Sequence, residues 1–371
     1  MDAGLADVLP SVAAALGLPV RGPGRLPMPV ARSAVVVLVD GLGEELLAAR
    51  GGHAPFLRSV RLGLGEALAV DCGFPSTTAT SMGTFGTARR AGAHGLVGMN
   101  VLAPELDLVF SELAWDPRVD PISWQPGTTV FEDVRAAGLP VIMIAPHYFD
   151  GSGLTRAALR GASFVAAKTL AQRVDAALAA LAAHDRVLVY LYWGEVDKVG
   201  HVHGCESFEW GEELERVDGE LARLVRSCRR DVLVAVTADH GMVDVPYADR
   251  VDLADEPELR AGVRHVGGEA RALHLYCHPG VVDAVDAAWR ARLGGDVEIV
   301  RRADAIERGW FGAVEPHVLP RIGDLLAVAV GRIAIVDSSS ARPELLRLIG
   351  QHGARTPQES LVPVLWVPGG R

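Results

Sequence analysis

The chain has 371 residues, of which 49% are hydrophobic and 22% are charged, a composition typical of a globular protein with a sizeable core. Its 46 acidic residues outnumber its 36 basic ones, and the net charge of −10 argues against a protein that coats nucleic acid polymers or anionic membranes. Four cysteines without a CxxC pair are too sparse for a disulfide framework and favour a reducing compartment.

The N-terminal segment begins with a short helical pattern and passes into a stretch rich in proline and glycine. It contains Asp2 and Asp7, and it lacks the basic start and long apolar run of a secretory signal. No stretch approaches the ~20 apolar residues that a membrane span needs. We therefore expect a soluble cytoplasmic protein without a membrane partner.

Apolar, β-branched runs alternate with helical patterns through the first two thirds of the chain. The run at 34–40 predicts a strand that ends at Asp40, before a glycine turn and a short helix. The later strands and helices are predicted at 139–146, 169–184, 186–193, 207–228 and 231–241. This alternation predicts an α/β fold with a doubly wound, mostly parallel sheet and helices on both faces.

From about residue 246 the pattern changes to shorter strands, one helix and more loops. We predict that residues 246–340 form a small α+β insertion that caps the main domain, which comprises 1–245 together with 341–371. The last apolar run, 361–368, is expected to return to the main core as a strand.

Polar residues with catalytic potential lie at or just past the ends of the predicted strands: Asp40, Thr78, Asp197, Asp239 and His240. Ligands of open parallel sheets bind beyond the carboxyl ends of the strands, so this placement predicts a single site. Taken one at a time, each residue has an ordinary explanation as a helix cap or turn former, and only the joint pattern indicates function.

Carboxylate and imidazole groups are suited to Zn²⁺ or Mn²⁺. Asp197 and His201 are four residues apart, so on a helical turn both face one ion. Asp239 and His240 are adjacent, and they can converge only in a turn beyond the strand end. With Asp40 and His352, three aspartates and three histidines are enough for two metal ions.

Shortly after Pro75 the sequence carries the candidate hydroxyl residues Thr77, Thr78, Thr80 and Ser81. A helix that starts here supplies backbone amides to an anion. A threonine hydroxyl is a poor nucleophile unless a base or a metal ion activates it. The same residues are also compatible with a plain helix N-cap.

Five motifs, in this order, resemble the alkaline phosphatase superfamily, and they are most similar to its nucleotide pyrophosphatase/phosphodiesterase branch: LVDGLG, FPSTTATSM, YLYWGEVDKVGHVHG, TADHGM and QHGARTP. The resemblance runs from about residue 34 to residue 363. It implies two divalent ions, zinc first and manganese as the alternative. One would be held by Asp40, Asp239, His240 and the Thr78 oxygen, and the other by Asp197, His201 and His352.

The resemblance also implies that Thr78 is the nucleophile, because it lies three residues after Pro75. Thr77 and Thr80 are the alternatives. Ser81 stands where the branch usually carries an asparagine, and it is expected to bind phosphate oxygens of the substrate. Cys72 does not indicate a sulfatase, because its surroundings, CGFPS, do not match the C-x-P-x-R pattern of the cysteine that sulfatases modify.

These observations predict a hydrolase of phosphodiester or pyrophosphate bonds in nucleotide-like or other small substrates, acting through a phosphothreonine. The alternatives on the same fold are a phosphomonoesterase, a phosphonate hydrolase or a phosphomutase. A third possibility, from another class of protein, is a non-catalytic metal-binding protein. Tyr148 and Phe149 are expected to border the substrate pocket. The natural substrate and the oligomeric state do not follow from the sequence.

Overall fold

The computed structural model describes residues 3–19, 21–22 and 24–370. Its largest sheet has seven strands in the order β2-β17-β8-β1-β7-β5-β6. Their bounds are β2 (Glu66–Asp71), β17 (Leu361–Pro368), β8 (Val232–Thr237), β1 (Ser33–Val39), β7 (Leu188–Trp193), β5 (Val141–Ala145) and β6 (Ser163–Ala166). β8, β1, β7, β5 and β6 pair in parallel, and β17 is antiparallel to both of its neighbours. The predicted mostly parallel α/β sheet is confirmed.

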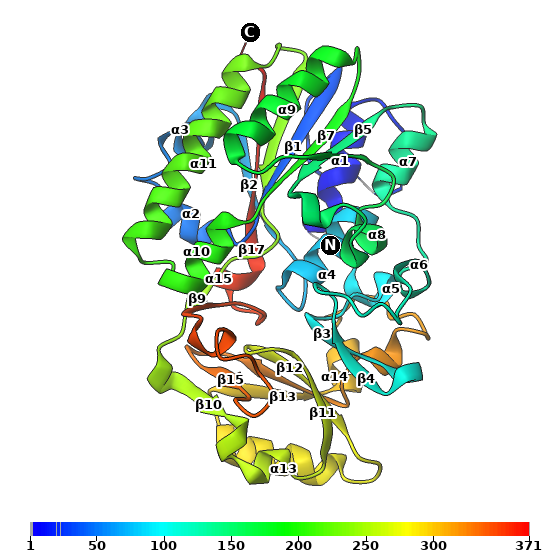
Figure 1. The fold of residues 1–371 in the computed structure, drawn as a ribbon, viewed down its shortest axis with the longest axis vertical. Helices are drawn as coiled ribbons and strands as arrows, with labels where there is room; N and C mark the ends of the chain where they lie inside the picture. The colour runs from blue at the N-terminus through cyan, green and yellow to red at the C-terminus, as the bar shows by residue number, and fades with distance from the viewer. Residues whose placement is uncertain (1–2, 20, 23, 371) are drawn as a thin grey trace.

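Helices cover both faces of this sheet (Figure 1). One face carries α2 (Glu44–Ala49), α3 (Pro55–Ser59), α9 (Leu170–Ala183), α10 (Glu195–His203) and α11 (Phe208–Ser227). The other carries α1 (Val8–Ala15), α4 (Thr78–Thr87), α7 (Val130–Ala136) and α8 (Gly153–Ala158). The shorter helices are α5 (Ala91–His94), α6 (Pro121–Trp124), α12 (Pro257–Arg260), α14 (Arg302–Glu307) and α15 (Pro357–Ser360). No described helix combines the length and apolar character needed to cross a bilayer.

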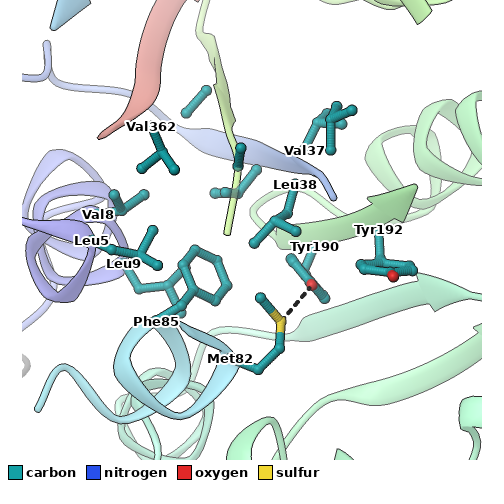
Figure 2. Packing of buried hydrophobic residues seen from close by; sticks show 14 of the residues in the cluster. Leu5, Val8, Leu9, Val37, Leu38, Met82, Phe85, Tyr190, Tyr192 and Val362 are labelled. Atoms are coloured by element: carbon teal, nitrogen blue, oxygen red, sulfur yellow. Dashed lines mark hydrogen bonds between the residues drawn. The ribbon is translucent and has the colours of Figure 1, made fainter. Parts of the chain in front are cut away.

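The core between α4 and the sheet fixes the start of that helix. Met82 and Phe85 of α4 point toward Leu38 of β1 and Tyr190 of β7 (Figure 2). The Tyr190 hydroxyl donates to the Met82 sulfur at 3.7 Å, and both side chains are buried. Burying such large side chains stabilises the fold by about 1.5–3 kcal/mol each. This packing holds Thr78, the first residue of α4, at the carboxyl ends of the parallel strands.

A second, antiparallel sheet lies beyond those carboxyl ends (Figure 1). Its strands are β11 (Val263–Glu269), β12 (Ala272–Cys277), β14 (Leu325–Ala329) and β13 (Val297–Arg301). One face packs on α13 (Val282–Leu293) around the buried Trp289, and the other face joins the main core through Val300, Leu326 and Val328. All four strands lie within 246–340, the segment predicted as a cap, and their inner face shares the main core, so the division into a main domain and a cap stays a prediction.

Three pairs of short strands complete the fold. β10 (Arg250–Asp252) pairs with β15 (Ala334–Val336), and β3 (Asn100–Ala103) pairs with β4 (Leu108–Ser111). β9 (Val243–Asp244) pairs with β16 (Gly350–Gln351), which brings the segment after β16 back to the main sheet.

A buried ion pair joins the second sheet to the main domain. Arg271, in the turn between β11 and β12, donates from Nε and Nη2 to the two carboxylate oxygens of Glu359 at 2.7 Å each. We expect Arg271→Ala to lower the free energy of unfolding by about 3–5 kcal/mol, because it leaves the Glu359 charge buried and unpaired. Denaturant titration measures the loss.

The matched control is Arg260→Ala, which removes a more exposed pair with Asp337 and is expected to cost at most about 1 kcal/mol. Equal losses in Arg271→Ala and Arg260→Ala would show that the buried pair contributes no more than an exposed one.

Candidate metal centre and active site

The structure brings all seven sequence-predicted centre residues to one place. Asp40 follows β1 directly, and Asp239 and His240 lie in the turn just after β8. The remaining four lie on α10, after β16 and at the start of α4, as follows: Asp197, His201, His352 and Thr78. The seven residues therefore come from five separate chain segments.

The first group of ligand atoms surrounds the Nε2 atom of His240. This nitrogen lies 3.2 Å from Thr78 Oγ1, 3.4 Å from Asp40 Oδ1 and 3.5 Å from Asp239 Oδ2. All of these residues except Thr78 are buried. The hydroxyl thus lies beside two carboxylates and an imidazole.

The second group surrounds Asp197 on α10. Its Oδ1 atom lies 3.4 Å from His201 Nε2 and 4.0 Å from His352 Nε2. The His352 ring stacks on the His240 ring with 3.8 Å between centroids, so the two groups are direct neighbours.

Two sets of ligand atoms, each with all members within 4.8 Å of one another, are Asp197, His201 and His352, and Asp40, Asp197 and His240. Asp197 belongs to both sets, whereas the resemblance assigned it to one. Asp239 is in neither set, but its Oδ2 atom contacts His240, a member of the set that also contains Asp40. A carboxylate within reach of both sets is compatible with two closely spaced cations.

The carboxylates in this centre are well suited to cations. Within the described part of the chain, Asp40 Oδ1, Asp197 Oδ1 and Asp239 Oδ2 are buried without a hydrogen-bond partner. Such atoms are costly to bury unless a charge compensates them. Burial, helped by the neighbouring Asp239 and Asp197, raises the pKa of Asp40 well above its usual range, and burial also raises the pKa of Asp197. The residues present therefore fit two divalent ions.

The three imidazoles are held in one tautomer by backbone carbonyl groups. Nδ1 donates to Gly350 O at 2.7 Å in His201, to Gly241 O at 2.9 Å in His240 and to Ser76 O at 3.0 Å in His352. A carbonyl oxygen only accepts, so each Nδ1 carries the proton and each Nε2 lone pair faces the centre. Burial lowers the pKa of His352, which keeps its ring neutral.

Among the candidate hydroxyl residues Thr77, Thr78, Thr80 and Ser81, Thr78 is the one that lines the cavity at the candidate centre. Thr77, Thr80 and Ser81 are fully buried, whereas Thr78 is partly exposed and lines a cavity of about 330 Å³. This burial favours Thr78 over Thr77 and Thr80. It also leaves the role of Ser81 in substrate binding a prediction.

The cavity beside Thr78 is mostly apolar and aromatic. Its lining residues include Met82, Met143, Leu154, Tyr190 and Tyr192. Tyr148 and Phe149 line it as well, and their contact with a substrate stays a prediction. Its charged lining residues among those described are Asp40 and Asp197. The cavity therefore offers stacking and apolar contact, and no lysine or arginine is among the described residues that line it.

Residues 34–355 match the family model described as type I phosphodiesterase / nucleotide pyrophosphatase. The chain belongs to this family. Among curated proteins, human ectonucleotide pyrophosphatase/phosphodiesterase family member 7 is 36% identical over 93 residues, which are 23% of this chain and 20% of that protein. The matched stretch thus spans about a fifth of this relative.

Two solved structures show the same fold as this member of the type I phosphodiesterase family. Murine ectonucleotide pyrophosphatase/phosphodiesterase 5 has a TM-score of 0.72 at 20% identity, with 90% of this chain and 87% of that chain covered. Phosphonoacetate hydrolase from Sinorhizobium meliloti 1021, in complex with phosphonoacetate, has a TM-score of 0.68 at 19% identity, with 91% and 90% covered. The family and both of these structural neighbours are hydrolases, and this chain has the same fold as the two neighbours.

Two residues of this candidate centre were missed by sequence reasoning. The Tyr192 hydroxyl, on β7, donates to Asp40 Oδ2. Glu269, at the end of β11, lies with Oε2 3.7 Å from His352 Nδ1, and within the described residues both of its carboxylate oxygens are buried without a hydrogen-bond partner. Tyr192 sits inside the predicted strand 186–193 without a distinguishing pattern. Glu269 comes from the second sheet, whose approach no local motif indicates.

We expect zinc binding to release protons and to weaken as the pH falls. The raised pKa of Asp40 and Asp197 in the metal-free centre means that these carboxyls keep protons to a higher pH than free aspartate, and a cation must displace them. Affinity is therefore full above the raised pKa and is lost as the pH drops through it. We therefore also expect an activity optimum at neutral to alkaline pH.

Calorimetric titration with zinc in two buffers of different ionisation enthalpy measures the protons released for each ion bound. A binding enthalpy that is the same in both buffers would contradict this expectation.

Proposed function

We propose that this protein is a two-metal hydrolase that cleaves phosphodiester or pyrophosphate bonds in nucleotide-like or other small substrates. The observation that carries the proposal is the position of the Thr78 hydroxyl, 3.2 Å from His240 Nε2 and beside two ligand sets that share Asp197. Asp40, Asp239 and His240 would hold one ion, and Asp197, His201 and His352 would hold the second. Asp197 is also within reach of the Asp40 and His240 ligand atoms, so it would serve both ions. Zinc is the proposed metal, with manganese as the alternative.

In the proposed reaction, Thr78 Oγ1 forms a bond to phosphorus while the bond from phosphorus to the leaving oxygen breaks. The Thr78 proton passes to solvent water, the leaving oxygen departs with the bonding electron pair and is protonated by solvent, and a phosphothreonine forms. Water then attacks this phosphorus, the bond from phosphorus to Thr78 Oγ1 breaks, and Oγ1 takes up the proton that the attacking water loses. Divalent ions in such a centre lower the pKa of a hydroxyl and neutralise charge on the phosphoryl group. Because α4 begins at Thr78, the first backbone amides of this helix would favour the phosphoryl oxygens.

The cavity beside Thr78 supports a substrate with an uncharged, flat or apolar group. Tyr148, Phe149 and Tyr192 offer aromatic surface, and Ser152 and Thr155 offer hydroxyls for orientation. A carboxylate substituent such as that of phosphonoacetate finds no lysine or arginine among the described residues that line the cavity. One murine neighbour was solved as an inactive variant in complex with AMP. We therefore favour a nucleotide-like diester over a small acidic phosphonate.

The deciding experiment compares kcat/KM for bis-p-nitrophenyl phosphate and p-nitrophenyl phosphate on one zinc-loaded preparation. We expect the diester to be preferred by more than about tenfold, a chelator to abolish turnover, and zinc or manganese to restore it. A monoester preference would favour the phosphomonoesterase alternative. Two bound ions without turnover on any phosphate or phosphonate ester would favour a metal-binding protein.

Location in the cytoplasm is part of the proposal. Its support is that the four cysteines are buried and unpaired, as in a reducing compartment.

A further inference from the structure

A second cavity lies on the other side of the segment that precedes Thr78. Its volume is about 440 Å³, and it adjoins a smaller cavity of about 80 Å³. Five residues line both: Asp71, Gly73, Phe74, Arg90 and Trp310. Among the described residues, neither cavity shares a lining residue with the cavity beside Thr78. We call this pair of cavities the Arg90 cleft.

The described residues that line the Arg90 cleft include more basic than acidic side chains, in a chain whose net charge is −10. The charged ones are Arg25, Arg90, Arg355, Asp7 and Asp71. Arg90 and Arg355, both exposed, line the smaller cavity together with Asp71. Within the described residues, neither guanidinium donates a hydrogen bond to a carboxylate or forms an ion pair with one. By contrast, Arg308, over the same Trp310 ring, is paired with Glu298 at 2.7 Å.

The same cleft has a rigid aromatic wall. The Phe74 and Trp310 rings meet edge to face with 5.0 Å between centroids, and each is at most 5% exposed. The Arg355 guanidinium carbon lies 4.5 Å from the centre of the Trp310 ring, which orients it by cation–π attraction. Two arginines beside an apolar wall match an organic anion better than a bare ion.

The segments that line the cleft are the ones that carry two residues of the metal centre. Phe74 is four residues before Thr78, and Arg355 is three residues after His352. Ser76 ties these segments together. Its carbonyl accepts from His352 Nδ1 at 3.0 Å, and its hydroxyl donates to Ala354 O at 2.6 Å. A ligand bound in the cleft would therefore contact the two segments that carry Thr78 and His352.

We propose that the Arg90 cleft is a second ligand site, separate from the metal centre, for a small organic anion with a phosphate-like head and a flat apolar body. Arg90 and Arg355 bind the head, because guanidinium groups form paired, charge-assisted hydrogen bonds with phosphate oxygens. Phe74 and Trp310 support the body. The site goes beyond the proposed hydrolysis and does not depend on it.

Phenylphosphonate is the probe, because it has both parts and contains no ester to hydrolyse. Calorimetric titration of the metal-loaded protein gives the number of sites and their affinities. Beside any equivalent that the metal centre takes, we expect one equivalent whose affinity falls at least about tenfold in the R90Q/R355Q double variant. Inorganic phosphate should bind this site more weakly, since it lacks the apolar body.

Arg230→Gln is the matched control, because it removes the same charge at an exposed position just before β8. This variant should bind phenylphosphonate at the Arg90 cleft and at the metal centre with the affinities of the wild type. The single variants R90Q and R355Q keep the test interpretable if the double variant does not fold. Binding by the double variant with the stoichiometry and affinities of the wild type would overturn the proposal. Since the readout is binding, absence of phosphodiesterase turnover would leave this result intact.

Discussion

Replacing Thr78 with alanine should lower kcat/KM for a diester substrate by at least about 10⁴-fold without loss of bound metal. The hydroxyl is the proposed nucleophile, and no other group in the centre can form the phosphothreonine at the same place. The metal sets remain because their members are the carboxylates and imidazoles. The helix remains as well, since Thr78 is the first residue of α4 and its side chain is not the N-cap. Turnover is measured with bis-p-nitrophenyl phosphate, and metal content by mass spectrometry.

Thr77→Ala and Thr80→Ala are the matched controls, since both hydroxyls are fully buried within three residues of Thr78. Both variants should keep turnover within about tenfold of the wild type, because neither side chain reaches the cavity. Thr78→Ser should keep part of the activity, since it retains a hydroxyl on the same carbon. An active Thr78→Ala variant together with an inactive Thr77→Ala variant would move the nucleophile and refute the assignment.

The proximity of several candidate metal ligands was predictable because these residues sit at strand ends. Asp40 closes an apolar run, and the Asp239–His240 pair follows another, so a parallel sheet brings them to one edge. The spacing of Asp197 and His201 predicts a shared helical face, and α10 places their ligand atoms 3.4 Å apart. These predictions rest on local pattern plus one rule of topology.

The parts that were missed depend on contacts between segments that are distant in sequence. Tyr192 contacts Asp40 only because β7 pairs with β1 in one register. Glu269 reaches His352 only because the second sheet packs against the main one. In the same way, the apolar run 361–368 predicted a strand but carried no information on direction, and β17 proved to be antiparallel between β8 and β2.

Changing Asp197 to asparagine should weaken the binding of both ions by about 100-fold or more, because this side chain is a member of both ligand sets. The asparagine keeps the size of the side chain but removes the charge that offsets two cations. Changing His201 to alanine should weaken one ion only, since His201 belongs to a single set. Metal content after dialysis against a weak chelator distinguishes the two outcomes.

Glu195→Gln is the matched control for Asp197→Asn. Glu195 lies on the same helix and loses the same charge, but it is partly exposed and pairs with Lys198 at 3.2 Å. The control should retain both ions and full turnover. Suppose that Asp197→Asn and His201→Ala each lost only the ion of the His201 set and kept the other ion. Asp197 would then serve a single cation, and the two sets would act independently. If instead both ions leave together, one carboxylate couples them, and the loss of turnover in Asp197→Asn should be as complete as in Thr78→Ala.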